Sequence, residues 1–184
     1  METATSSVQP APARQTNDGR ARRHPAWIRT SAPGGPHHRQ IKDVLARYRL
    51  HTVCEEAQCP NIGECWSHGA ATFMLMGDVC TRRCHFCAVA QGKPGYLDPA
   101  EPDHLAQTVA AMNLRYAVLT SVNRDDLPDQ GADHIARAIE AIHAAAPACR
   151  IEMLIPDFRG DPGCIARVVH TPLTTLAHNV ETVP

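Results

Sequence analysis

Residues 72–87, TFMLMGDVCTRRCHFC, join a short apolar run to three closely spaced cysteines. Residues 72–76 have the length and composition of a buried strand, and Gly77 and Asp78 supply a turn directly after it. Cys80, Cys84 and Cys87 then follow in a C-x3-C-x2-C spacing. The stretch therefore predicts a cysteine loop at the carboxyl end of a buried strand.

A second cysteine triplet, Cys54, Cys59 and Cys65, precedes that strand in a C-x4-C-x5-C spacing. Zinc sites usually take four ligands from short paired motifs, and neither triplet has that form. Three thiolates instead suit a cubane iron–sulfur cluster whose fourth iron keeps an open position. A zinc or redox-inert site is one alternative. A ferredoxin-like electron carrier is another, although it would normally provide a fourth cysteine for each cluster.

The remaining cysteines, Cys149 and Cys164, lie on separate predicted elements, so we expect them to be buried core residues. The sequence carries no export signal, and this favours metal ligation over disulfide formation for the triplets.

From residue 72 onward, apolar periodicity predicts alternating strands and helices. The expected strands cover residues 72–76, 116–121, 151–155 and 174–177. The first expected helix begins at Pro102, the second ends at Pro147, and the third opens at Asp161 and Pro162. Such alternation predicts an α/β fold with a parallel sheet and right-handed crossovers, here a partial (β/α) TIM-like barrel of about four strands.

Polar residues follow each predicted strand. They are the cysteines of residues 80–87, then Asn123, Arg124, Asp125 and Asp126, then Asp157 and Arg159, and finally Asn179 and Glu181. All four groups leave the carboxyl ends of parallel strands, where barrels of this class assemble their active sites. The pattern predicts a site built around the second triplet.

Three regions are expected along the chain. Residues 1–36, rich in Pro, Ala, Ser, Gly and Arg, are predicted to be a disordered N-terminal extension. Residues 37–70 should hold an amphipathic helix over 38–50 and the first triplet, which we interpret as a turn-rich loop for an auxiliary cluster. Residues 71–184 form the partial barrel.

Composition limits the partners and the compartment. The chain has 184 residues, with 18 Lys and Arg against 19 Asp and Glu, which gives no basic field for nucleic acid. The longest apolar run, residues 70–76, is too short to span a membrane. Without a secretory signal the protein is expected to be cytoplasmic, the alternative being an arginine-rich transit peptide in residues 1–24.

The C-x3-C-x2-C loop after a strand, with Phe86 before its last cysteine, resembles the loop of the radical S-adenosylmethionine (SAM) superfamily. Longer blocks resemble the lipoyl synthase family, and together the resemblance covers roughly residues 25–184. They are CEEAQCPNIGECW (54–66), ATFMLMGD (71–78), LTSV (119–122), RDDL (124–127), IPDFRG (155–160) and NVETVP (179–184).

The resemblance implies two [4Fe–4S] clusters, SAM, and insertion of two sulfur atoms at C6 and C8 of a protein-bound octanoyl chain. Cys80, Cys84 and Cys87 would hold the catalytic cluster that cleaves SAM. Cys54, Cys59 and Cys65 would hold the auxiliary cluster that donates sulfur. The weaker cofactor-binding candidates are Arg124 and Asp126, for the carboxylate or amine of SAM, and Asn179 and Glu181, for the cofactor or the carrier peptide.

The implied partners are octanoylated lipoyl carrier domains, such as the E2 subunits of 2-oxoacid dehydrogenases and the glycine cleavage H protein. An electron donor such as ferredoxin or flavodoxin is also implied. No nucleic acid and no membrane are expected as partners.

Two departures from the family accompany the resemblance. The family's barrel continues for about two further strand–helix units, and its auxiliary cluster takes a fourth ligand from a serine in an Arg-Ser-Ser-Tyr motif that does not occur here. The sequence therefore looks like the N-terminal portion of a lipoyl synthase. The alternatives are a truncated, catalytically incompetent fragment that still binds iron–sulfur clusters and carriers, and a remnant that holds no iron.

Overall fold

The protein, described here by a computed structural model over residues 34–68 and 70–180, is built on a five-stranded sheet in the order β1-β2-β5-β6-β7. The strands are β1 (His51–Thr52), β2 (Thr72–Leu75), β5 (Tyr116–Ser121), β6 (Arg150–Leu154) and β7 (Thr175–Ala177). From β2 to β7 the pairing is parallel, which confirms the predicted strands and the α/β class. β1 pairs antiparallel with β2 and was not predicted, because two residues carry no periodicity.

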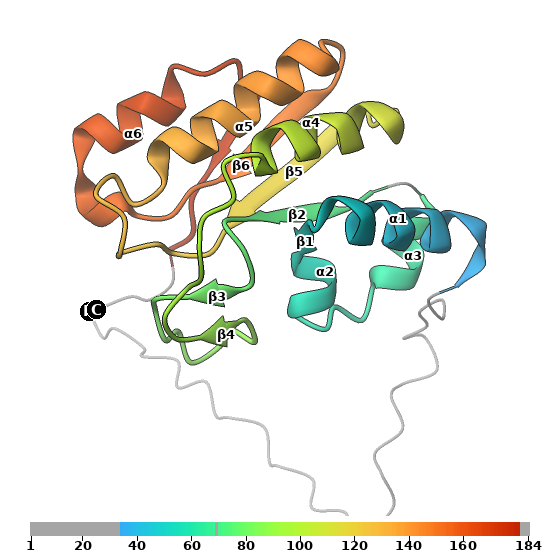
Figure 1. The fold of residues 1–184 in the computed structure, drawn as a ribbon, viewed down its shortest axis with the longest axis horizontal. Coiled ribbons are helices and arrows are strands. Elements are labelled where there is room, and N and C mark those ends of the chain that lie inside the picture. The colour runs from blue at the N-terminus through green and yellow to red at the C-terminus, as the bar shows by residue number, and fades with distance from the viewer. Residues whose placement is uncertain (1–33, 69, 181–184) are drawn as a thin grey trace, which may run out of the picture.

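Three helices cover one face of the sheet, α4 (Glu101–Ala111), α5 (Ala132–Ala145) and α6 (Pro162–Val169), with α5 in contact with both neighbours (Figure 1). Pro102 lies in the first turn of α4, and α5 ends before Pro147, both as predicted. The Asp161 side chain accepts hydrogen bonds from the backbone N–H groups of Gly163 and Cys164 at 2.8 and 3.0 Å. This cap begins α6 at the predicted position.

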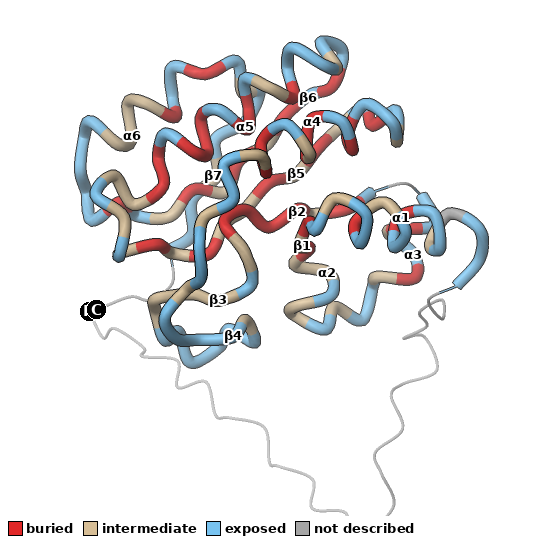
Figure 2. The backbone as a smooth tube through the Cα atoms, in the orientation of Figure 1, coloured by how far each residue is buried: buried red, intermediate tan, exposed pale blue. Residues whose placement is uncertain are grey.

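The main core lies between the sheet and these helices, where the buried residues are concentrated (Figure 2). Its fully buried side chains come from both layers and include Leu105, Val109, Leu119, Ile135, Ile139, Ile142, Ile151 and Met153. Cys149 is buried, as predicted, whereas Cys164 is only partly buried at the start of α6, so its predicted place inside the core is wrong. Its sulfur lies 3.4 Å from the carbonyl oxygen of Asp129.

Ile139→Ala is expected to lower the free energy of unfolding by about 2–5 kcal/mol, because the fully buried side chain would leave a cavity between α5 and the sheet. Urea denaturation of the protein measures this loss. His143→Ala, at an exposed position of the same helix, is the matched control and should change stability by less than about 0.5 kcal/mol. Equal losses in the two variants would contradict this packing.

The N-terminal region is more helical than predicted. It consists of α1 (Gly35–Tyr48), α2 (Val53–Glu56) and α3 (Ile62–Ser67), so the turn-rich loop expected around the first triplet is wrong. The Thr52 hydroxyl caps α2 by accepting from the Glu55 N–H at 3.3 Å, and the fully buried Trp66 anchors α3. Because α1 begins at Gly35, the predicted extension over 1–36 is too long by its last residues, and residues 1–33 lie outside the described part.

A separate two-stranded parallel sheet, β3 (Val79–Cys80) and β4 (Ala90–Gln91), follows β2. It was not predicted, because its strands are too short to show a periodic pattern. A 3-10 turn (Phe158–Gly160) lies between β6 and α6. In Figure 1 the β3–β4 pair and α2 both lie beyond the same edge of the helix-covered sheet. None of the helices in residues 34–68 and 70–180 is long and apolar enough to cross a membrane.

Candidate functional site

The second cysteine triplet forms a loop held closed by the β3–β4 pair. Val79 and Cys80 pair with Ala90 and Gln91, and the Gly92 N–H donates to the Cys80 carbonyl oxygen at 3.0 Å. Within the loop, the Cys87 N–H donates to the Cys84 carbonyl oxygen at 3.1 Å, and the Cys84 and Cys87 residues are exposed. The predicted cysteine loop after β2 is therefore present.

The Cys80 sulfur is the acceptor of two backbone N–H groups, from Arg82 at 3.4 Å and from Asn123 at 3.3 Å. Hydrogen bonds to a ligating sulfur are among the means by which proteins tune iron–sulfur clusters. The donor set and its surroundings thus fit an iron–sulfur cluster.

Among the described residues, no three His, Cys, Asp or Glu side chains converge on a position for a single metal ion. A cubane cluster makes no such demand, because each thiolate binds a different iron atom. The open spacing of Cys80, Cys84 and Cys87 around one cavity agrees with a cluster.

That cavity, of about 380 Å³, lies between the two cysteine regions. Its walls carry the second triplet on one side. On the other side are Val53 of α2, the helix that contains Cys54, and Ala57, which directly follows that helix. Apolar residues from the main sheet and its strand ends close the remaining wall, namely Met74, Val122 and Leu154. The second triplet therefore lines a largely apolar chamber that reaches α2. Cys54 and Cys59 line a separate cavity of about 350 Å³, together with His38 and Lys42.

The first triplet is spread over two short helices. Cys54 lies in α2, Cys65 lies in α3, and Cys59 is between them with its N–H donating to the Cys54 carbonyl oxygen at 3.1 Å. Burial raises the pKa of the Cys65 thiol, and the neighbouring Cys54 and Cys59 raise it further. A bound cation reverses such repulsion between thiolates, so this set also fits a metal cluster.

An ion-pair network ties the cysteine loop to the strand ends. Arg82 donates from Nε and Nη2 to the Asp125 carboxylate at 3.0 and 2.9 Å, and from Nη1 to Asp157 at 2.6 Å. The Thr81 hydroxyl also lies 2.6 Å from Asp125. The hydrogen bond from Arg82 holds the pKa of Asp125 and of Asp157 below the usual range, and the same bonds raise the pKa of Arg82. The loop is thus anchored beyond β5 and β6.

Asp125→Asn is expected to destabilise the protein by about 1–2 kcal/mol at neutral pH, because it weakens the charged hydrogen bonds of Arg82. The folded-state pKa of Asp125 is depressed, so its stabilisation is present above the unfolded value near 4 and is lost as the pH falls toward the folded value. Urea denaturation at a series of pH values from 7 downward should show that the difference in unfolding free energy between the protein and the Asp125→Asn variant shrinks. The exposed Asp103→Asn control should show no such change with pH. A pH-independent difference would contradict the ion-pair origin.

The other predicted site residues differ in whether they line the chamber. Arg124 is 4% exposed, pairs with Asp126 through Nε and Nη2 at 2.9 and 2.8 Å, and reaches the Gly95 carbonyl oxygen at 3.3 Å. It holds two loops together and does not line the chamber of the second triplet. Asn179 does line that chamber, whereas Glu181 lies outside the described residues.

A polar cavity of about 260 Å³ adjoins the chamber and contains residues that the sequence did not single out. Ser121, Pro156 and His178 line it together with Arg82, Asp157 and Asn179. The buried Ser121 hydroxyl has no hydrogen-bond partner among the described residues, and it borders both spaces. Its position at the end of a predicted strand was the available signal.

Comparison with known proteins agrees with this geometry. Residues 74–184, more than half of the chain, match the model of the radical SAM superfamily, and residues 4–59 match the N-terminal domain of lipoyl synthase of that family. Similar proteins include lipoyl synthases from Laribacter hongkongensis (58% identical over 163 residues) and Halorhodospira halophila (55% over 163 residues).

These alignments cover 88% of this chain but 52% and 49% of the two relatives, so the chain spans about half the length of the curated relatives it matches. Members of the superfamily use SAM and a [4Fe–4S] cluster, the chemistry for which the second triplet is suited. The chain belongs to the radical SAM superfamily.

Proposed function

We propose that this protein is a lipoyl synthase, which inserts two sulfur atoms at C6 and C8 of an octanoyl chain carried on a protein lysine. The observation that best supports the proposal is the chamber of about 380 Å³ that has Cys80, Cys84 and Cys87 on one wall and the Cys54 helix on the other. A substrate chain in that chamber would extend from the second triplet to the helix that carries Cys54. The similarity to lipoyl synthases points the same way.

Each triplet is assigned one [4Fe–4S] cluster, with Cys80, Cys84 and Cys87 as ligands of the first and Cys54, Cys59 and Cys65 as ligands of the second. When bound, the first supplies the electron that cleaves SAM and the second supplies sulfur. The N–H groups of Arg82 and Asn123 stabilise the charge on the Cys80 sulfur.

The apolar walls of the chamber have two tasks in this proposal. An aliphatic chain in the chamber would bury its apolar surface against Met74, Val122 and Leu154, which is favourable. They also keep solvent away from the carbons at which the reaction takes place. Val53 and Ala57 would hold the chain end beside the helix that carries Cys54.

The adjoining polar cavity is suited to the polar parts of SAM. Ser121 and Asn179 border both spaces, so a ligand there would present its reactive end to the chamber. We assign cofactor contacts first to these two residues. Asp126 and Arg124 remain predicted contributors, with Arg124 acting through the loop that it holds.

We further propose lipoyl carrier domains, those of 2-oxoacid dehydrogenase E2 subunits and of glycine cleavage H protein, as substrate proteins, and a ferredoxin or flavodoxin as reductant. The exposed Cys84 and Cys87 residues leave the first cluster accessible to such a reductant.

A labelled substrate tests the reaction. An octanoyl-lysine peptide carrying deuterium at C6 and C8 is incubated anaerobically with reconstituted protein, reductant and SAM. Deuterium should appear in the 5′-deoxyadenosine that is released, because the radical abstracts hydrogen from those carbons. Unlabelled 5′-deoxyadenosine formed at the same rate with and without peptide would overturn the assignment of the substrate.

A further inference from the structure

Glu101 is a buried carboxylate that joins three elements and has no part in the mechanism above. It lies in the first turn of α4, is 6% exposed, and accepts the Met76 N–H at 3.1 and 2.9 Å with its two oxygens. His134 of α5, 4% exposed, lies with its Nε2 2.6 Å from the same carboxylate. The partly positive N-terminus of α4 also favours a carboxylate at this position.

Met76 directly follows β2, and its backbone is in the left-handed region, which is energetically unfavourable for a residue other than glycine. Its φ is +69°, and that of the following Gly77 is +96°. A non-glycine residue in the left-handed region costs about 1–2 kcal/mol and persists where its surroundings fix it. The surroundings here are the Glu101 carboxylate and Gly131, where an added Cβ would overlap the Met76 sulfur.

The direction of this turn decides where the cysteine loop lies. Cys80 follows Met76 by four residues, and only Gly77, Asp78 and Val79 come between them. A change at Met76 would therefore move β3, and with it the loop, relative to the chamber. Reactions at a positioned radical are sensitive to displacements of about 1 Å.

We infer that Glu101, oriented by His134, is a positioning residue that fixes the Met76–Gly77 turn and thereby places the Cys80–Cys87 loop against the chamber. The inference rests on the proposed role of Cys80, Cys84 and Cys87 as cluster ligands. Burying a carboxylate and an imidazole brings a desolvation penalty that two apolar side chains would avoid. Stability alone therefore does not account for the pair, whereas holding a backbone N–H requires an acceptor at that point.

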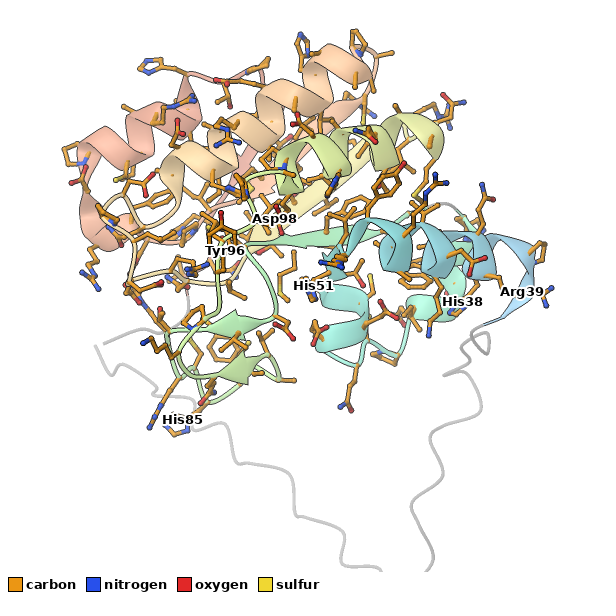
Figure 3. The ribbon with its side chains drawn as sticks, in the orientation of Figure 1. His38, Arg39, His51, His85, Tyr96 and Asp98 are labelled. Atoms are coloured by element: carbon orange, nitrogen blue, oxygen red, sulfur yellow. The ribbon has the colours of Figure 1, made fainter. Side chains whose placement is uncertain are left out.

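The outer side of the turn is open. A cavity of about 410 Å³ is lined by Met76, Gly77 and Glu101 together with Arg49, His51, Tyr96 and Asp98, three of which are labelled in Figure 3. Without the carboxylate, water from this cavity could reach the Met76 N–H. Amide exchange at Met76 should therefore report directly whether Glu101 holds the turn.

The test compares Glu101→Ala, the conservative Glu101→Gln and, as a control with a comparable loss of stability, Ile139→Ala. Hydrogen exchange of a peptide spanning residues 74–80 is followed by mass spectrometry in the cluster-free protein. In the reconstituted protein, the change that SAM produces in the EPR spectrum of the reduced cluster is recorded. Neither measurement requires sulfur insertion, so failure of the inference and failure of the proposed lipoyl synthase activity remain distinguishable.

In Glu101→Ala we expect about tenfold faster exchange at Met76 and at least about tenfold weaker response of the spectrum to SAM, with partial recovery in Glu101→Gln. Ile139→Ala should retain the normal exchange at Met76 and the normal response to SAM. If Glu101→Ala does not fold, Glu101→Gln decides, with an expected severalfold increase in exchange. Exchange and spectra equal to those of Ile139→Ala would overturn the inference.

Discussion

Cys84→Ala is expected to abolish SAM cleavage, with a fall of more than about 100-fold in the rate of 5′-deoxyadenosine formation. Loss of a residue that merely supports a metal ligand lowers activity or affinity by about 10–100-fold, so loss of a direct ligand should exceed that range. Cys84 is assigned to one iron of the first cluster, and no other cysteine lines the chamber apart from Cys80 and Cys87.

The measurement is 5′-deoxyadenosine released by reconstituted protein with reductant, together with iron content. Cys164→Ala is the matched control, since Cys164 is a partly buried cysteine at the start of α6 and does not line the chamber. It should keep both its iron and its rate. If the Cys84→Ala variant cleaved SAM at the normal rate, the assignment of the cluster to this loop would be contradicted.

Cys59→Ala should separate the two halves of the reaction. The variant is expected to lose sulfur insertion by more than about 100-fold while it still forms 5′-deoxyadenosine within about threefold of the normal rate. The reason is spatial, because Cys54, Cys59 and Cys65 lie in α2, α3 and their connection, whereas the triplet proposed to cleave SAM lines a different cavity.

Two products are measured in one incubation, the thiolated peptide by mass and 5′-deoxyadenosine by chromatography. The Gln58→Ala variant, at an exposed position next to Cys59, is the control and should keep both products. Loss of SAM cleavage together with sulfur insertion would show that the first triplet serves the same cluster chemistry as the second, and would contradict separate roles.

The parallel sheet was predictable because local sequence patterns identify its strands and helices. Pro102 and the Asp161-Pro162 pair can begin helices but cannot continue them, and Pro147 ends α5, so the element boundaries follow from backbone chemistry. The cysteine spacing is equally local. These features were sufficient to place a cysteine loop at the carboxyl end of β2.

What the sequence did not reveal depends on contacts between distant segments. Of the adjacent residues Arg124, Asp125 and Asp126, it was Asp125 that reached the cysteine loop, because the turn after β5 directs its carboxylate to Arg82. The backbone of Met76 is in the left-handed region, and its N–H bonds to Glu101, a residue 25 positions further along the chain. The helices α2 and α3 are too short for periodicity to distinguish from turns.

The mass of an octanoyl-lysine peptide after anaerobic incubation with reconstituted protein, reductant and SAM tests the proposed activity most directly. A lipoyl synthase should add two sulfur atoms, with loss of two hydrogens once the sulfurs join in a ring. An unchanged peptide, from protein that holds both clusters and cleaves SAM, would contradict the proposed function and leave the chain as a radical SAM protein with another substrate.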